Sequence, residues 1–270
     1  MTKLGFIGAG NMGFALLIGF SVAIAESKRR VGIYIYDADP LKREKLKSAG
    51  YNICEDELEI AENCKYILIA CKPQHVKDLL HNIKPALTPE SVIVSLCAGI
   101  SADYIRKITG EDTKVILVMP NMPVLLGAGA SAMACDGAVS REEFDFVRGI
   151  IESCGTSEVI PMSKMNEIIC INASSPAFIY MFAQSFAEYA AKQGINERAA
   201  LNLFAKTLIG SAKMILETDS SIAELIAQVS SKEGTTAAGI QALYDYGLQD
   251  VVEKACEACT KRAYELGESH

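Results

Sequence analysis

The sequence lacks several features that mark common protein classes. None of its 270 residues is tryptophan, only three are histidine, and the 26 lysines and arginines form no long basic run among 33 aspartates and glutamates. A net charge of −7 without a basic stretch argues against a surface that binds nucleic acid, although a small anionic ligand can still bind at a local positive site.

Long apolar runs are also scarce. The longest, near Phe14 to Ala25, has about a dozen residues, whereas a membrane-spanning helix needs about 20. The chain enters the strand-like LGFIG almost at once, so we expect no signal peptide. These absences predict a cytoplasmic protein that does not contact a membrane.

The nine cysteines are an odd number with no framework spacing, and most lie in apolar segments. This usage is typical of reduced core thiols. Cys256 and Cys259 form a C-x-x-C pair, but no second pair and no nearby histidine completes a zinc set. We therefore predict no metal site.

The first 161 residues alternate apolar, strand-like runs with helix-like runs, as in a parallel sheet covered by helices. The predicted strands are LGFI, GIYIY, YILIA, SVIVSL and KVILVM, with SAMAC and SEVI as weaker candidates; the predicted helices include DPLKREKLKSAG, HVKDLLHNI, SADYIRKI and 141–153. This order predicts an α/β, Rossmann-type domain over residues 1–161.

After Pro161 almost nothing is strand-like. Apolar residues recur at helical spacing to the end of the chain, with helix starts at Asn196 and at Ser220-Ser221. Several of these helices are apolar on more than one face, and about 110 residues cannot bury that much surface alone. We predict an all-helical domain over 162–270 that is covered by a second subunit.

A glycine motif lies at the start of the chain. KLGFIGAGNMG runs from a strand into a helix and places Gly8, Gly10 and Gly13 in G-x-G-x-x-G spacing around Asn11 and Met12. The first glycine permits a tight turn, the second lets the backbone approach a pyrophosphate, and the third lets the helix pack closely on the strand. With the helix N-terminus facing the phosphates, the motif predicts a dinucleotide cofactor.

The end of the second strand bears on which cofactor is used. Asp37 closes GIYIYD, and an acidic residue there usually binds the ribose hydroxyls and disfavours a 2′-phosphate. Lys42 and Arg43 follow closely and could face such a phosphate, although the commoner role of such a pair is a solvated helix face. The sequence slightly favours NADH and leaves NADPH open.

Three later strand ends are expected to line the nicotinamide, because ligands gather at the carboxyl ends of parallel strands. The residues are Cys71, Lys72 and Pro73 after YILIA, Cys97, Ala98 and Gly99 after SVIVSL, and Asn121 between two prolines after KVILVM.

The stretch VSSKEGTTAAGIQAL interrupts the helical half with Ser230, Ser231, Gly234, Thr235 and Thr236. A helix N-cap explains one hydroxyl here, because serine and threonine accept hydrogen bonds from free N–H groups of the first turn. The remaining hydroxyls need another explanation.

Together these segments resemble the pyrroline-5-carboxylate reductases, the last enzymes of proline biosynthesis, over essentially the whole chain. The matching blocks, in order and spacing, are GFIGAGNMG, ACKPQ, VMPNMP, SSPAFIYMFAQSFAEYAAKQGI, LIGSAKM and VSSKEGTTAAGIQAL.

The resemblance implies hydride transfer from C4 of the nicotinamide of NADPH or NADH to C5 of 1-pyrroline-5-carboxylate. It implies that Ser231 and the amides of Gly234 and Thr235 hold the substrate carboxylate, that Thr236 hydrogen-bonds the ring nitrogen as the catalytic residue, and that Ser175 contributes to the substrate site. It also implies a homodimer interlocked through the helical domain, with rings of five dimers in some members.

Four positions depart from the family pattern. Lys232-Glu233 replaces Pro-Gly in the substrate loop, Ser175 replaces the glycine of Ser-Gly-Pro, Met122 replaces a threonine, and Leu117 replaces a frequent arginine. Two alternatives therefore stay open: a reductase of the same architecture acting on a related cyclic imine, and a dinucleotide-binding relative without this activity.

Overall fold

The computed structural model describes residues 2–26 and 31–268, and its contacts divide the chain into two compact units. Unit 1 comprises the residues up to Ser174 together with those from Ala258 onward, and unit 2 comprises Ser175–Glu257. Each unit is described separately below.

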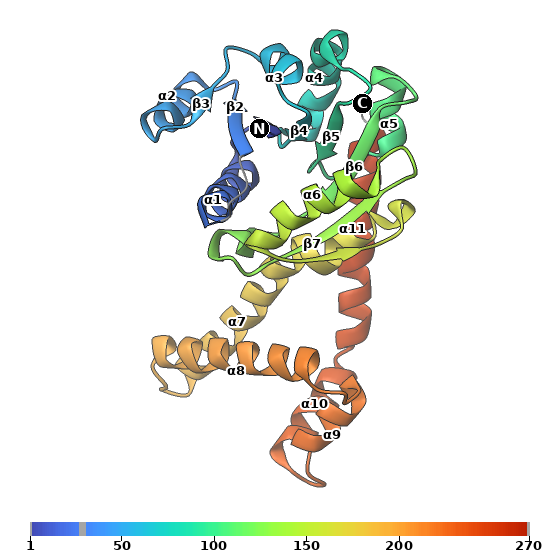
Figure 1. Cartoon of the computed structure of the whole chain (residues 1–270). Coiled ribbons are helices and arrows are strands. Elements are labelled where there is room, and N and C mark those ends of the chain that lie inside the picture. Colours follow the sequence, from blue (N-terminus) through green and yellow to red (C-terminus); the bar gives the residue numbers. More distant parts are fainter. Residues whose placement is uncertain (1, 27–30, 269–270) are drawn as a thin grey trace. The chain divides into compact units, whose positions relative to one another are not determined.

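Unit 1 is built on one eight-stranded sheet with the order β3-β2-β1-β4-β5-β6-β7-β8 (Figure 1). Its strands are β1 (Thr2–Ile7), β2 (Val31–Tyr36), β3 (Asn52–Ile53), β4 (Tyr66–Ile69), β5 (Val92–Ser95), β6 (Lys114–Met119), β7 (Gly129–Cys135) and β8 (Gly155–Val159). The sequence predicted each of these strands except β3, which has only two residues.

One strand runs against the prediction of a parallel sheet. β7 pairs with β6 antiparallel, whereas the other neighbouring pairs in this sheet are parallel. Only Pro120 to Ala128, including the short helix η3 (Met122–Leu126), connects the two strands. A parallel return needs a crossover of about a dozen residues or more, so this connection is too short for one.

Helices cover both faces of the sheet. They are α1 (Asn11–Glu26), α2 (Pro40–Ser48), α3 (Glu57–Asn63), η1 (Pro73–His75), α4 (Val76–Ile83), η2 (Lys84–Ala86), α5 (Ala102–Thr109), α6 (Arg141–Ile151), η4 (Glu152–Cys154), η5 (Met162–Lys164) and the π-helix η6 (Ile169–Ser174). The sequence analysis did not name α3, whose residues ELEIAEN are mostly polar.

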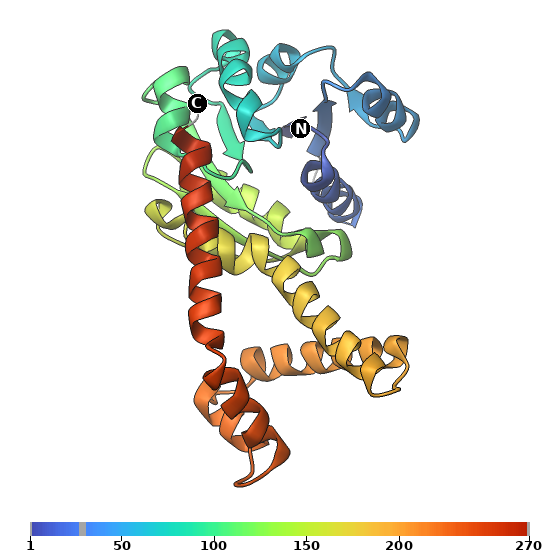
Figure 2. The ribbon, with the colours of Figure 1, turned by 180° about the vertical axis from the view of Figure 1, so that it is seen from behind.

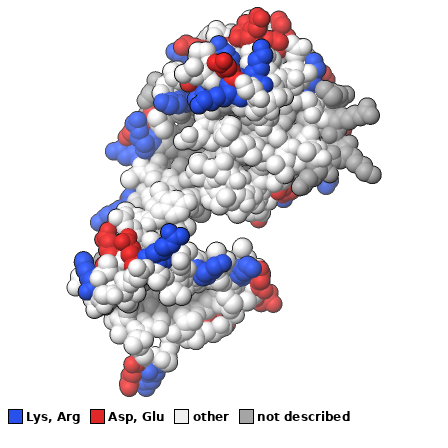
Figure 3. All heavy atoms as spheres, turned by 90° about the vertical axis from the view of Figure 1, so that its left-hand side faces the viewer, with Lys and Arg blue, Asp and Glu red and all other residues white. Residues whose placement is uncertain are grey.

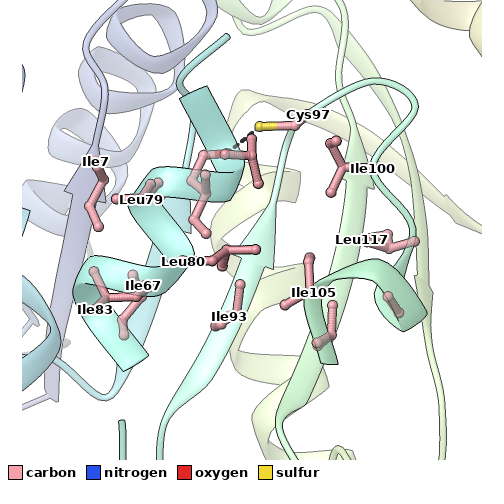
Figure 4. Packing of buried hydrophobic residues seen from close by; sticks show 14 of the residues in the cluster. Ile7, Ile67, Leu79, Leu80, Ile83, Ile93, Cys97, Ile100, Ile105 and Leu117 are labelled. Atoms are coloured by element: carbon pink, nitrogen blue, oxygen red, sulfur yellow. Dashed lines mark hydrogen bonds between the residues drawn. The ribbon is translucent and has the colours of Figure 1, made fainter. Parts of the chain in front are cut away.

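Successive residues of a strand point to opposite faces of the sheet and contribute to two separate apolar clusters. On one face, Leu4 and Phe6 of β1 pack with α1 and α6; on the other, Ile67 and Ile93 pack with α3, α4 and α5. Figure 4 shows Leu80 of α4 lying over these strands in the second cluster. Each fully buried side chain of this size stabilises the fold by about 1.5–3 kcal/mol.

The end of the chain contributes to the second cluster. Ala263, from the C-terminal part of α11 (Leu248–Glu268), is buried there, and this part of the helix lies beside β6 and α5 (Figures 1 and 2). Gly99 has φ +81°, and a Cβ at this position would lie 2.4 Å from the Ala263 carbonyl oxygen. A side chain at position 99 would therefore push α11 away.

Unit 2 consists of helices alone: α7 (Ser175–Lys192), α8 (Glu197–Glu217), α9 (Ile222–Val229), α10 (Thr235–Asp245) and the first turns of α11. Asn196 caps α8 and Ser221 caps α9, as the sequence predicted. Phe186 of α7 stacks on Phe204 of α8 with ring centroids 4.4 Å apart.

Little of unit 2 is buried. Within 175–257, all of which the structure describes, only Ala187 and Ala190 are buried, while Tyr180, Met181, Leu203 and Leu216 are 64–82% exposed. Figure 3 shows much of one face of this unit as uncharged surface. The surplus of apolar helical surface predicted from the sequence is thus present.

The compact units differ from the predicted domains, which divided the chain between residues 161 and 162. The chain is helical from Met162 onward, but Met165 and Ile169 are buried in the core of unit 1. The division by contacts therefore falls later, at the start of α7.

Among the described residues, α8 is long and apolar enough, by length and composition only, to cross a membrane. Lys206 and Lys213 divide its sequence, so it contains no uninterrupted apolar run of that length. The expectation that the protein does not contact a membrane stays a prediction.

Candidate functional site

The glycine-rich loop between β1 and α1 has the geometry that its spacing predicted. Gly8 has φ +98°, and a Cβ there would lie 2.9 Å from the backbone of Ala70 and Cys71. A Cβ on Gly13 would lie 2.3 Å from the Gly8 carbonyl oxygen, whereas one on Gly10 would meet nothing within 4 Å. The turn and the helix packing thus need Gly8 and Gly13, and open space at Gly10 leaves room for a ligand.

A cavity of about 440 Å³ opens beside this loop, at the carboxyl ends of β1, β2 and β4. Of the predicted cofactor residues it is lined by Gly8, Gly10, Asp37, Cys71 and Lys72. Its position and size suit the adenosine half of a dinucleotide.

Asp37 is buried at the edge of this cavity, and its carboxylate is already engaged. Oδ2 accepts a hydrogen bond from the Ala9 amide at 2.6 Å and lies 3.6 Å from Lys42 Nζ; Oδ1 accepts one from the Asp39 amide at 2.9 Å. The side chain therefore fastens the glycine-rich loop to the start of α2.

Two cations lie next to that carboxylate. Besides Lys42, Arg43 donates from Nη1 to the Asp37 carbonyl oxygen at 2.6 Å, and its guanidinium lies 5.4 Å from the centre of the Tyr36 ring. The carboxylates of Asp39, Glu57 and Asp78 also line the cavity, so an anionic group is favoured only directly beside the Lys42 and Arg43 side chains.

Asn121, which the sequence predicts to line the nicotinamide, is hydrogen-bonded within unit 1. Its Oδ1 accepts from the Ala130 amide at 2.9 Å, and its Nδ2 donates to the Asn172 carbonyl oxygen at 3.2 Å. Asn172 in turn donates to the Met119 and Ala130 carbonyl oxygens at 2.6 and 3.2 Å. The two amides thus fasten η6 to β6 and β7, and Asn121 does not line the adenosine cavity.

Other predicted cofactor residues also lie outside that cavity, namely Asn11, Met12, Gly13, Pro73, Cys97, Ala98 and Gly99. Ala98 instead lines a second space of about 330 Å³ with Ser174 and the α11 residues Cys259 and Arg262. Their contacts with a nicotinamide stay predictions.

The segment Ser231 to Thr236 forms a turn that leads into α10. Gly234 is the N-cap, and its amide donates to the Ser231 carbonyl oxygen at 2.9 Å. In this fully described segment no side chain caps the helix, so the first amides of α10 have no side-chain acceptor. Thr235 and Thr236 are exposed in its first turn.

Glu233 has φ +63°, the single positive value among the non-glycine residues that the structure describes. Glycine adopts this conformation freely, whereas most side chains do not. Glu233 thus stands where the family pattern has glycine, and the backbone at this position keeps the left-handed conformation that glycine adopts most easily.

Several cavity residues were missed by the sequence analysis. They are Ile7, Tyr36, Ala38, Asp39, Lys42, Glu57, Ala70, His75, Asp78, Leu79 and Asn82. The sequence offered two interpretations of Lys42, a phosphate partner and a solvated helix face, and neither placed it in the cavity wall. Glu57 and Asn82 belong to α3 and α4 and form a hydrogen bond of 2.8 Å, which no local pattern in the sequence reveals. No group of three or more potential metal ligands occurs among residues 2–26 and 31–268.

Two family models match the chain. Residues 162–266 match the family model described as "Pyrroline-5-carboxylate reductase dimerisation". Residues 3–99 match the model described as "NADP oxidoreductase coenzyme F420-dependent". The chain is 33% identical over 269 residues to pyrroline-5-carboxylate reductase of Escherichia coli K12, with 99% of both chains covered. It is 32% identical over 266 residues to pyrroline-5-carboxylate reductase 3 of Danio rerio, covering 98% of this chain and 91% of that one.

Solved structures give the same picture. The pyrroline carboxylate reductase of Plasmodium falciparum with NADP bound superposes with a TM-score of 0.88 at 28% identity, covering 98% of each chain. The 1-pyrroline-5-carboxylate reductase of Streptococcus pyogenes superposes with a TM-score of 0.87 at 25% identity, covering 97% of this chain and 98% of that one.

Proposed function

The chain belongs to the pyrroline-5-carboxylate reductase family, and from this premise we propose that it reduces 1-pyrroline-5-carboxylate to L-proline with NADPH or NADH, the last step of proline biosynthesis. The observation that carries the proposal is the start of α10. Its first amides have no side-chain cap, and the hydroxyls of Ser231 and Thr236 belong to the same turn.

The chemistry of this turn suits the substrate. A carboxylate is stabilised by free N–H groups and by the positive end of a helix dipole, so Ser231 with the amides of Gly234 and Thr235 would hold it. The hydroxyl of Thr236 would then hydrogen-bond the ring nitrogen. Ser175, the first residue of α7, would complete the substrate site.

The residues of unit 1 fit a dinucleotide. Gly10 gives the backbone close access to a pyrophosphate, and the N-terminus of α1 offers its amides to the phosphates. When bound, the reduced nicotinamide supplies the hydride that reaches C5 of the substrate. A threonine hydroxyl is a weak acid, so we assign Thr236 to positioning and hydrogen bonding of the imine rather than to protonation.

NADPH is the cofactor we favour. The Asp37 oxygens are held by two backbone amides, and Lys42 and Arg43 bring positive charge to the place where a 2′-phosphate would lie. The acidic residue therefore contributes less repulsion than its position in the sequence indicated. The slight preference for NADH drawn from Asp37 alone is the competing prediction.

The assembly we propose is a homodimer through the helical domain. The match to the dimerisation model covers α7 to α11, and these helices carry the exposed apolar residues of unit 2. A second subunit would also cover α8, which accounts for its apolar composition in a cytoplasmic enzyme. A ring of five such dimers is the larger assembly predicted from the family resemblance.

The test is an assay at 340 nm with 1-pyrroline-5-carboxylate and either NADPH or NADH. We expect rapid oxidation by the wild type and a fall in kcat of about 10²–10³-fold in Thr236→Ala, as for the loss of one transition-state hydrogen-bond donor. Thr109→Ala is the matched control, because Thr109 Oγ1 bonds only the Ile105 carbonyl oxygen of its own helix. It is expected to keep wild-type activity.

The outcomes separate the candidate functions. If neither cofactor is oxidised although both bind, the proline reaction is refuted, and a related cyclic imine becomes the candidate because Lys232-Glu233 alters the substrate loop. Arg43→Ala should reduce kcat/KM for NADPH about tenfold or more and leave that for NADH within twofold. An equal loss with both cofactors would contradict the assignment of Arg43 to the 2′-phosphate.

A further inference from the structure

Two cysteines stand side by side where neighbouring strands end. β4 and β5 are parallel, with Ile69 opposite Ser95, so continuing the register by two residues brings Cys71 opposite Cys97. The Cys97 thiol donates to the Cys71 carbonyl oxygen at 3.3 Å and contacts the Ile69 carbonyl oxygen at 3.6 Å. Figure 4 shows Cys97 at the margin of the apolar cluster, with its sulfur in a hydrogen bond.

The spacing permits a covalent bond. Adjacent strands lie about 4.7–4.9 Å apart, and the Cα atoms of a disulfide are about 4.4–6.8 Å apart. We propose that Cys71 and Cys97 form a reversible disulfide on exposure to a peroxide, and that this pair is a redox-sensitive site in the wall of the dinucleotide cavity.

The two thiols differ in the ways that such a reaction needs. Cys71 is partly exposed and lines the cavity, whereas Cys97 is buried. The hydrogen bond from Cys97 lowers the pKa of the Cys71 thiol, and the same interaction together with burial raises the pKa of Cys97. Cys71 is therefore the attacking group and Cys97 the resolving one.

The reaction balances with a peroxide as the oxidant. The Cys71 thiolate attacks one peroxide oxygen, the O–O bond breaks, and hydroxide leaves and is protonated, which gives a sulfenic acid on Cys71. The Cys97 sulfur then attacks the Cys71 sulfur, the S–O bond breaks, and water leaves as the disulfide forms. Two thiols are oxidised, and one hydrogen peroxide is reduced to two water molecules.

Cys54 and Cys64 also lie near one another, but they differ from the strand-end pair in reactivity. Burial raises the pKa of Cys54 to about 11 and that of Cys64 to about 12, so both are poor nucleophiles at neutral pH. Cys256 and Cys259 lie three residues apart on α11, where the Cβ atoms are about 5–6 Å apart, beyond the roughly 3.5–4.5 Å of a disulfide. The strand-end pair is thus expected to react first.

The cavity couples this pair to the cofactor, and that part of the inference rests on the proposed function. Gly8 packs directly on the backbone of Cys71, since a Cβ at Gly8 would lie 2.9 Å from the Cys71 nitrogen. A bond that draws the Cys71 side chain toward Cys97 changes the cavity wall beside the glycine-rich loop. A bound dinucleotide should in turn shield Cys71 from the peroxide.

The experiment exposes the reduced full-length protein to hydrogen peroxide, blocks the remaining thiols and maps disulfides by peptide mass spectrometry. We expect a peptide linking Cys71 to Cys97, reversed by dithiothreitol, and formation at least tenfold slower with saturating NADP⁺. The double variant Cys256→Ala/Cys259→Ala should form the same link at the same rate.

Cys97→Ala provides the second arm. It should accumulate a sulfenic acid on Cys71 that dimedone traps, with circular dichroism as the check on folding. A dominant link between any other cysteines, or unreacted Cys71 while other thiols oxidise, overturns the proposal. A link that forms equally fast with NADP⁺ overturns the coupling to the cofactor. Because this readout needs no turnover, failure of the reductase assay and failure of the thiol proposal are distinguishable.

Discussion

The two units of this chain differ in how far they bury their apolar residues. Unit 1 sandwiches its sheet between two helical layers, and strand residues such as Phe6 and Ile67 are at most 1% exposed. In unit 2, Leu203 and Leu216 of α8 are 71% and 82% exposed. Unit 1 thus contains its own core, whereas the apolar surface of unit 2 requires a partner that the single chain does not provide.

The same difference separates two kinds of motif in the sequence. The glycines of unit 1 are explained by contacts within the unit, for example Gly13 against the Gly8 carbonyl oxygen. The turn before α10 in unit 2 has uncapped amides and exposed hydroxyls that no contact in the chain explains. The proposed function explains these groups by a bound carboxylate substrate.

The largest effect should come from a charge on the apolar face of unit 2. In Leu203→Glu a carboxylate would be buried without a partner in the proposed dimer, which costs several kcal/mol. We expect the dimer dissociation constant to rise at least 100-fold and the activity to fall in parallel. Analytical ultracentrifugation over a dilution series measures the dissociation.

The matched control places the same charge on unit 1. The exposed fraction of Leu41 in α2, 67%, is similar to that of Leu203, 71%. Leu41, however, belongs to the unit that has its own core. Leu41→Glu should leave the dimer intact. A Leu203→Glu protein that stays dimeric at nanomolar concentration would contradict the contrast between the units.

An intermediate effect is expected from an ion pair inside unit 1. Glu143 is 4% exposed, and its Oε1 lies 2.9 Å from both Lys65 Nζ and Lys114 Nζ. Burial alone would raise the pKa of this carboxyl, but the hydrogen bonds from Lys114 and Lys65 lower it to about 2. The folded pKa is thus below the unfolded value of about 4.5.

Its contribution to stability is therefore complete above about pH 4.5 and is lost as the pH falls toward 2. Glu143→Gln should lower the free energy of unfolding at pH 7 by about 2 kcal/mol and flatten its pH dependence between about pH 5 and 3. Urea unfolding followed by circular dichroism measures both. The exposed Glu62→Gln should change neither, and a parallel pH curve for Glu143→Gln would refute the assignment.

Much of this architecture could be predicted from sequence because it depends on local pattern. Apolar runs identified the buried strands, and Asn196 and Ser221 marked helix starts. What could not be predicted depends on distant partners. The Asp37 carboxylate accepts a bond from the Ala9 amide, 28 residues away, and Asn121 is bonded to Asn172, 51 residues away.

The smallest effect concerns the substrate loop, where Glu233 holds φ +63°. Glu233→Gly removes a side chain that disfavours this conformation, by about 1 kcal/mol, and also removes a negative charge near the proposed carboxylate site. We expect the KM for 1-pyrroline-5-carboxylate to fall a few-fold with little change in kcat. The gain is modest because glycine also loosens the unbound loop.

A second variant separates the two causes. Glu233→Gln removes the charge but keeps a side chain of similar size in the left-handed conformation. If charge dominates, Glu233→Gln and Glu233→Gly lower KM equally, and added salt reduces the difference from wild type. If backbone strain dominates, only Glu233→Gly does so, and salt has little influence. No change in either variant would mean that the turn before α10 already holds its binding geometry, and that this departure from the family pattern leaves the site of unit 2 intact.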